Sequence, residues 1–510
     1  MKLAIVTALA AASNAGAAVN VDGGRLQGAR EGGLAVYKGV PFAASPVGEL
    51  RWREPQPVKP WKGVRPARAF APACMQSGVS MPGEAPPRVS EDCLYLNIWA
   101  PAKARVAPVM VFFPGGGLVN GNASAPIYWG DRLASRGAVV ITVGYRLGPL
   151  GFLALPELAA ESPHASSGDY GLLDQVAALR WVKRNAAAFG GDARRVTIFG
   201  QSSGSMSVSL LMASPLARGL FQRAIGESGG VFEPISLAPN YSLAGAERQG
   251  AAYAASLGAT SLKALRALPA ERFVGPGANA IAHPVVEPYF LPQPPYETFR
   301  AGRQNDVPLL VGWNAEEARS LIGPEPIKAA SFAADIGRAF GPLPAPLMAA
   351  YPHATDSEAR QGRLDFERDL RFGWDMWAWA RLQTATGTAP VHVYYLTRRP
   401  PFPAGSLQAD WGAGHFVDLW YVFGHGDQAP WRWSAVDQRL ADAVEGYWTA
   451  FAATGDPNAP GRPAWPAFRD AAEGPVLDIG DRITVGAVPN LATMKVFDAV
   501  YGAWRGGPAK

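Results

Sequence analysis

The chain has 510 residues, of which 48% are apolar, with 57 glycines and 46 prolines. Its length would allow two or three domains, yet no segment has the composition of a linker and no internal repeat is found. The 47 basic and 42 acidic residues leave a net charge of +5. Because lysine and arginine form no basic stripe with interleaved aromatic residues, nucleic acid is not predicted as a partner.

The first 17 residues have the pattern of a secretory signal peptide. Lys2 supplies a positive charge, residues 3–12 are a short apolar stretch, and residues 15–17 match an A-x-A cleavage site. An apolar first helix is the alternative interpretation. No later run reaches the roughly 18 apolar residues of a membrane span. We therefore expect a single mature domain, residues 18–510, that is secreted or periplasmic.

The sequence contains only two cysteines, Cys74 and Cys93. An oxidising compartment favours a disulfide between them, and two unpaired thiols are the alternative. No nearby histidines complete a zinc site, so the cysteines are not predicted as metal ligands. We expect no metal and no other cofactor.

Apolar runs alternate with helical patterns along the chain. Strands are predicted at 36–40, 94–99, 109–113, 138–143, 195–199, 307–312 and 391–396, and helices at 172–189, 206–212, most of 331–383 and 437–451. The runs at 109–113 and 138–143 are expected to be adjacent strands of a sheet that is covered on both faces. This alternation predicts an α/β fold.

Two glycine-rich clusters each follow a predicted strand. The first is at 114–117, and the second, at 200–204, contains Ser202 and leads into a helical pattern. A serine on a sharp strand-to-helix turn, with a glycine-rich loop upstream to bind an oxyanion, is typical of serine hydrolases. The bare G-x-S-x-G pattern is weak evidence, because a chain this rich in glycine yields about 0.4 such matches by chance.

A second G-x-S-x-G match contains Ser228. Paired glycines and an early proline at 229–234 oppose a helix after Ser228, whereas Ser202 lies between a strand and a helix-compatible run. A helix N-terminus helps to stabilise an oxyanion, so Ser202 is predicted as the nucleophile. A serine that only caps the helix is the alternative.

A serine needs a base, and histidine suits that role at neutral pH. Six histidines are present, of which His415 lies in a small-residue loop after the last predicted strand. In the order serine, acid, histidine the base comes last on such a loop, which favours His415 over a loop histidine without a role. The acid is expected after the strand at 307–312, where Glu316 and Glu317 remain alternatives and a solvated surface pair is also possible.

Together these residues resemble the type-B carboxylesterase family, which includes cholinesterases, mammalian carboxylesterases and bacterial p-nitrobenzyl esterases. The shared motifs cover nearly the whole mature chain and lie at 48–52, 90–97, 145–146, 171–175, 189–192 and 455–458. The resemblance implies an α/β-hydrolase fold, with a central, mostly parallel sheet flanked by helices. Helical insertions are implied around a gorge, among them a segment near 324–383.

The resemblance also implies roles for individual residues. The family pattern Gly-x-Asn-x-x-Glu, at 312–317, makes Glu317 the acid, and the motif at 412–424 makes His415 the base. The remaining implied features are an oxyanion hole of the backbone N–H groups of Gly116, Gly117 and Ser203, a role for Ser228 close to the acid, the Cys74–Cys93 disulfide, and the ion pairs Arg51–Glu91 and Arg146–Asp174.

The chain departs from the family pattern near the predicted nucleophile. Gln201 replaces the more usual glutamate, which removes a negative charge, and Pro114 stands where many members have histidine or tyrosine. The loop between the cysteines has no aromatic residue, so a choline site is not expected.

The resulting prediction is a serine carboxylesterase that acts on a small-molecule ester through an acyl-enzyme. A specialised esterase for a bulky natural product or toxin is one alternative, and a non-catalytic binding or adhesion protein is another. The acyl and alcohol preferences and the oligomeric state are left open.

Overall fold

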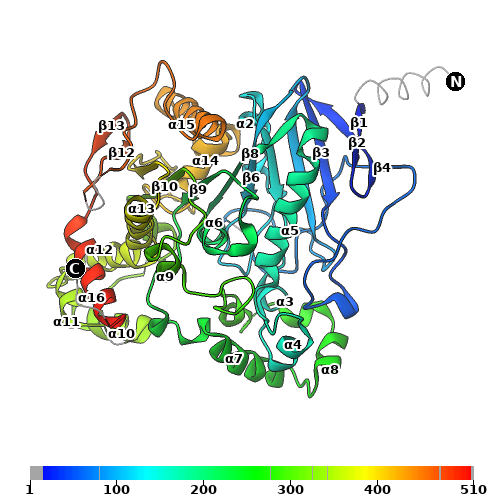
Figure 1. Ribbon diagram of the computed structural model, residues 1–510. Coiled ribbons are helices and arrows are strands. Elements are labelled where there is room, and N and C mark those ends of the chain that lie inside the picture. Colours follow the sequence, from blue (N-terminus) through cyan, green and yellow to red (C-terminus); the bar gives the residue numbers. More distant parts are fainter. Residues whose placement is uncertain are drawn as a thin grey trace.

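A single mixed sheet runs through the computed structural model, which describes residues 15–79, 81–275, 277–323, 325–341, 343–469 and 473–506. In these residues the strand order is β1-β2-β3-β5-β7-β6-β8-β9-β10-β11-β12-β13, with β4 beside β2 (Figure 1). The strands are β1 (Ala15–Val21), β2 (Gly24–Glu31), β3 (Leu34–Pro41), β4 (Val64–Pro66), β5 (Tyr95–Pro101), β6 (Ala107–Phe113), β7 (Val139–Val143), β8 (Gly191–Gln201), β9 (Arg223–Glu227), β10 (Leu309–Asn314), β11 (Val391–Leu396), β12 (Val476–Ile479) and β13 (Ile483–Gly486).

The middle of the sheet is parallel, from β7 through β12. At one edge β1, β2, β3 and β5 pair antiparallel, and at the other β13 pairs antiparallel with β12. The predicted mostly parallel sheet is therefore confirmed. In an open sheet of this kind ligands bind at the carboxyl ends of the parallel strands, and this edge is where the candidate site must be sought.

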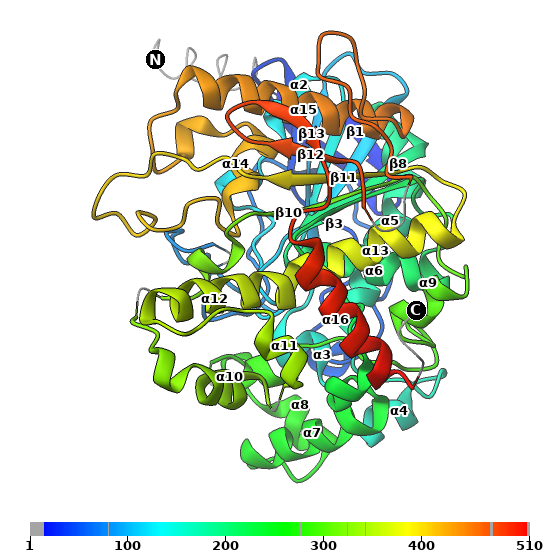
Figure 2. The same ribbon diagram turned by 90° about the vertical axis from the view of Figure 1, so that its left-hand side faces the viewer.

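Helices cover both faces of the sheet (Figures 1 and 2). They are α2 (Asp131–Ser135), α3 (Gly148–Phe152), α4 (Pro156–Glu161), α5 (Tyr170–Asn185), α6 (Ser203–Ala213), α7 (Leu243–Ser256), α8 (Leu262–Ala267), α9 (Pro295–Arg300), α10 (Phe332–Phe340), α11 (Ala345–Ala349), α12 (Asp356–Arg368), α13 (Trp374–Thr386), α14 (Val417–Phe423), α15 (Ala435–Thr454) and α16 (Leu491–Trp504).

The alternation of side chains along β6 explains why both faces are covered. Val109 and Val111 belong to the core that also contains α5, α6 and α13. Met110 and Phe112 belong to the opposite core, which contains α2, α14 and α15. Because successive residues of a strand point to opposite faces, a strand that is apolar throughout must be buried on both sides.

All seven predicted strands are present, and the strand predicted at 391–396 has the bounds of β11. The helix predicted at 172–189 is α5 followed by a 3-10 helix, Ala186–Phe189. The prediction missed β1, β2, β4, β9, β12 and β13. These strands are short or carry charged and small residues, as in the sequence RAIGE of β9, so they lack a clear apolar run.

The predicted helical segment near 324–383 comprises α10, α11, α12, a π-helical turn (Asp369–Gly373) and α13. In Figure 2, α10, α11 and α12 lie beside the C-terminal helix α16, away from the helices α14 and α15. The three tryptophans of α13 are buried in the core. This segment therefore packs partly as core and partly as a separate helical layer.

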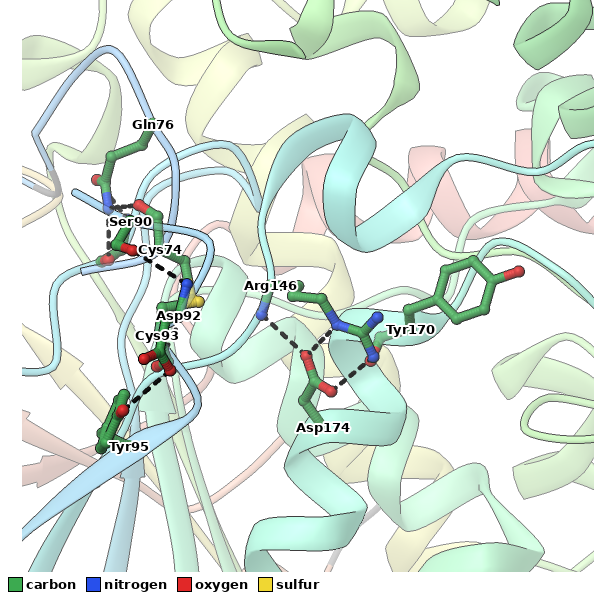
Figure 3. Close-up of a disulfide and its surroundings, with 10 residues drawn as sticks. Cys74, Gln76, Ser90, Asp92, Cys93, Tyr95, Arg146, Tyr170 and Asp174 are labelled. Carbon is green, nitrogen blue, oxygen red and sulfur yellow. Dashed lines mark hydrogen bonds and ion pairs between the residues drawn. A yellow bond between two sulfur atoms is a disulfide. The ribbon is translucent and has the colours of Figure 1, made fainter. Parts of the chain in front are cut away.

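The structure contains the implied disulfide and both implied ion pairs. Cys74 and Cys93 are bonded, with sulfur atoms 2.03 Å apart. The Arg146 guanidinium donates two hydrogen bonds of 2.8 Å to the fully buried Asp174 (Figure 3), and Arg51 pairs with Glu91. Burial raises the pKa of Asp174, and the adjacent Arg146 opposes that rise. The disulfide and the Arg51–Glu91 pair fix segments that precede the glycine-rich cluster at 114–117, and the Arg146–Asp174 pair ties the segment after β7 to α5.

The predicted signal peptide lies mostly outside the described residues, which begin at Ala15. From Ala15 onward the chain forms β1 and pairs with β2, with Ala18 opposite Gln27. Within the described ranges, no helix is both long enough and apolar enough to cross a membrane.

Candidate active site

Ser202 lies in a sharp turn between β8 and α6. Its φ of 58° and ψ of −129° are strained for a residue other than glycine, as expected where a strand must reverse directly into a helix. Its backbone N–H donates to the Glu227 carbonyl at 2.8 Å, which anchors the turn to the end of β9. Ser202 occupies the N-cap position of α6, but its hydroxyl makes no capping hydrogen bond. A purely structural capping role therefore finds no support.

The glycine-rich loop at 115–117 packs directly against this turn. A Cβ atom on Gly115 would lie 2.9 Å from the Ser202 Cβ, so only glycine allows so close an approach. Gly116 has a φ of 125°, which is also restricted to glycine. The Ser203 hydroxyl accepts a hydrogen bond from the Leu118 N–H at 3.2 Å and ties the loop to α6.

The backbone N–H groups predicted as oxyanion donors remain available. Within the described residues, those of Gly116 and Gly117 donate to no other protein group. The N–H of Ser203 opens α6, where the first N–H groups of a helix have no intrahelical partner. Three donors therefore lie on the two segments that meet at Ser202.

Glu317 and His415 are hydrogen-bonded to each other. Glu317 Oε2 lies 2.6 Å from His415 Nδ1, and the two side chains are 0% and 2% exposed. Glu317 Oε1 accepts from the backbone N–H of Asn314 at 2.7 Å, which orients the carboxylate. A carboxylate on Nδ1 holds the imidazole with Nε2 free to accept a proton, as a general base requires.

The alternative acid, Glu316, faces away from the imidazole. Its carboxylate accepts from the Ala413 N–H at 3.0 Å and forms ion pairs with Arg319 and Arg399. Glu316 thus fixes the loop that carries His415 without contacting the ring. Of the two glutamates, Glu317 is the one that contacts His415, and its role as the acid stays a prediction.

Ser228 also follows a strand, β9, and also has a positive φ, of 54°. No helix follows it, and its side chain is fully buried with no hydrogen-bond partner among the described residues. Its N–H donates to the Gly312 carbonyl at 2.9 Å. The prediction that Ser228 lacks the helix of a nucleophile turn is confirmed, although the sequence pattern did not reveal β9.

A buried carboxyl group, that of Asp418, lies close to Glu317, and a second, that of Glu227, lies close to Asp418. Asp418, in α14, is desolvated and close to Glu317, and these two effects raise its pKa to about 8. Burial, together with the neighbouring Asp418, raises the pKa of Glu227. Burial therefore disfavours the charged form of both Asp418 and Glu227.

Sequence reasoning missed several groups that hold the histidine. Phe372, in the π-helical turn, stacks on the His415 ring with centroids 4.3 Å apart. The Ser320 hydroxyl accepts from the His415 N–H at 2.8 Å, and Asn314 Nδ2 donates to the Gly414 carbonyl at 2.8 Å. Asn314 is part of the motif that placed Glu317, whereas Ser320 and Phe372 carry no signal in the sequence.

A cavity of about 300 Å³ is lined by residues that neighbour some of these groups along the chain. Its walls include Val231, two residues after Gly229, whose backbone packs on the Ser202 carbonyl. They also include Leu370, which is two residues before Phe372. The lining is mostly apolar and comes from the segment after Ser228, from residues 284–295, from α10, α11 and the π-helical turn, and from α16. Across the described residues, no group of three histidine, cysteine or acidic side chains suits a metal ion.

Comparison with known proteins identifies the family of the chain. The model of the Carboxylesterase family matches residues 15–333 and 345–496. The chain belongs to the carboxylesterase family. It is therefore a hydrolase of carboxylic esters with an α/β-hydrolase fold.

Relatives cover nearly the whole carboxylesterase domain. A fumonisin B1 esterase from Sphingopyxis macrogoltabida is 34% identical over 478 residues, or 89% of this chain and 85% of that protein. A para-nitrobenzyl esterase from Bacillus subtilis (strain 168) is 33% identical over 471 residues, or 88% and 91%. Among solved structures, a PNB esterase covers 94% of this chain and 99% of its own at 31% identity, with a TM-score of 0.80.

Proposed function

We propose that this carboxylesterase cleaves esters through a Ser202–His415–Glu317 triad. The observation that carries the proposal is the 2.6 Å contact between Glu317 and His415 at the sheet edge where Ser202 lies. Ser202 Oγ attacks the ester carbonyl as its proton passes to His415 Nε2. His415 then gives the proton to the leaving alcohol, and a water molecule hydrolyses the acyl-enzyme by the same route.

The tetrahedral intermediate carries a negative oxygen, for which we assign the N–H groups of Gly116, Gly117 and Ser203 as donors. Gly116 and Gly117 are on the loop that packs against Ser202, and Ser203 begins α6. Each such donor typically stabilises the transition state by about 3 kcal/mol. The N-terminus of α6 adds a favourable dipole.

The cavity of about 300 Å³ is our candidate for the site that holds an apolar part of the ester. Its size and apolar lining suit an alkyl or aryl group rather than a charged one. A bulky natural-product ester is a second candidate substrate, favoured by the similarity to an enzyme named for fumonisin B1. A non-catalytic binding role is disfavoured because the serine, histidine and glutamate of the proposed triad are all present and Glu317 contacts His415.

We also propose that residues 1–17 are a signal peptide and that the mature enzyme is exported. The support is the charge, apolar stretch and A-x-A site in the sequence. The disulfide is consistent with an oxidising compartment.

A panel of p-nitrophenyl esters of increasing acyl length tests the triad. We expect Ser202→Ala to lose at least about 10⁴-fold in kcat with the thermal midpoint retained, because the nucleophile is gone while the fold is intact. The matched control is Ser228→Ala, the other serine in a G-x-S-x-G match, which should retain turnover. Activity that survives in Ser202→Ala would overturn the assignment.

A further inference from the structure

Gln201 links the turn that carries Ser202 to the loop that carries His415. It is the last residue of β8 and is 1% exposed. Its Nε2 atom donates to the backbone carbonyl of His415 at 2.6 Å and lies 3.4 Å from the imidazole Nε2. One amide group therefore contacts both the backbone and the ring of the proposed base.

Apart from Gln201, the His415 backbone is held more firmly at its N–H than at its carbonyl. The N–H donates to Ser320 at 2.8 Å. Within the described residues, the carbonyl accepts besides Gln201 only from the Asn314 amide, at 3.4 Å. Among the described residues, loss of the Gln201 amide thus leaves this buried carbonyl with one long hydrogen bond, from Asn314. The position of the loop relative to Ser202 depends on Gln201, because the two residues are adjacent in the chain.

The amide also affects the charge on the ring. A neutral imidazole presents a lone pair on Nε2, whereas an imidazolium would direct an N–H toward the N–H groups of Gln201. The aromatic faces of Phe372 and Phe416 add no charge. On the other side of the ring, the Glu317 carboxylate contacts Nδ1.

The remaining charged groups around this loop are held by other partners. Asp418, Glu227 and Tyr394 lie beyond Glu317, and burial raises the pKa of each of them. Glu316 is neutralised by ion pairs with arginines. Gln201 is therefore the polar side chain that adjoins Nε2, the atom that exchanges the proton with Ser202.

We infer that Gln201 is a positioning residue for His415. Its amide holds the loop carbonyl and faces the ring at Nε2, so that the imidazole keeps its place relative to Ser202. The inference rests on the proposed roles of Ser202 and His415.

The test is the pH dependence of kcat/KM for p-nitrophenyl acetate in Gln201→Glu and Gln201→Met. The carboxylate of Gln201→Glu cannot donate to the carbonyl and stabilises an imidazolium. The acid limb of the profile, where kcat/KM falls as the pH is lowered, should therefore shift to higher pH by about one unit or more. Gln201→Met keeps the volume but removes the donor, and should lower kcat by about ten-fold or more with little change in KM.

The matched control is Gln383→Glu, a fully buried glutamine whose amide donates to Asp306 instead. It should lower the thermal midpoint without moving the acid limb. An unchanged acid limb in Gln201→Glu, or an unchanged kcat in Gln201→Met, would overturn the inference. If Ser202→Ala is inactive in the same assay, such a result counts against Gln201 alone; if Ser202→Ala is active, the triad itself is wrong.

Discussion

At the scale of single residues, catalysis by this chain depends on a small number of buried polar contacts. Glu317 is fully buried and accepts from a backbone N–H while it holds His415. A buried carboxylate with these partners is costly to desolvate but well oriented. Burial also raises the pKa of Asp418, which lies close to Glu317, and that of Glu227, which lies close to Asp418.

Asp418 gives a testable pH dependence of stability. Its folded pKa of about 8 lies above the ordinary value of an aspartate, so the folded state retains a proton that the unfolded state has released. The free energy of unfolding therefore falls as the pH rises from about 4 to about 8. The Asp418→Asn variant cannot ionise at this position. Between about pH 4 and pH 8 its free energy of unfolding should therefore fall by at least about 1.4 kcal/mol less than that of the wild type.

Chemical denaturation at pH 5 and pH 8 measures this difference. The control is Asp410→Asn, at a position that is exposed to water, which should follow the wild type. A fall in stability of Asp418→Asn as large as that of the wild type would show that Asp418 is already ionised in the folded protein.

At the scale of elements, the site is built from segments that each end at the same sheet edge. β8 supplies Ser202, β10 supplies the Glu317 turn, and the loop between β11 and α14 supplies His415. The sequence predicted these three strands and the residues after them, because each strand is an apolar run followed by small or polar residues. It did not predict β9, whose carbonyl of Glu227 anchors the Ser202 turn.

Side-chain contacts between elements were also beyond prediction. Phe372 stacks on His415 from a π-helical turn 43 residues earlier in the chain. The periodicity of a helix does not say which of its aromatic residues reaches another loop, because that depends on how α12 and α13 pack on the sheet.

The 3-10 helix Ile235–Leu237 supplies one wall of the cavity. A substitution in this wall tests whether the cavity holds the acyl chain of the substrate. Leu237 lines the cavity and is 44% exposed, so a larger side chain there fits without disturbing the core. Leu237→Trp should raise KM for p-nitrophenyl decanoate by about ten-fold, the cost of removing roughly two methylene groups from contact. KM for p-nitrophenyl acetate should change little.

Leu321→Trp is the control for this variant, since Leu321 is 42% exposed and does not line the cavity. Equal kinetics of Leu237→Trp and wild type on both esters would show that the long acyl chain binds elsewhere.

At the scale of the whole molecule, the N-terminal region offers a test of export. Cleavage after Ala17 would leave Ala18 to Val21 to pair with β2, so the mature chain keeps most of β1. Expression with the full N-terminus should give a periplasmic or secreted protein. Its N-terminal sequence should begin at Ala18, and its mass should be that of residues 18–510. An intact N-terminus on the exported protein would contradict the signal peptide.

The proposed mechanism requires Ser202 as the nucleophile, and covalent labelling of the active serine tests this role most directly. An organophosphate that reacts with serine hydrolases should add one group to the native enzyme and abolish ester hydrolysis. Trypsin separates the two candidate serines, with Ser202 in the peptide 196–218 and Ser228 in the peptide 224–248. We predict that mass spectrometry finds the adduct on Ser202; an adduct on Ser228, or none on an active enzyme, would contradict the account.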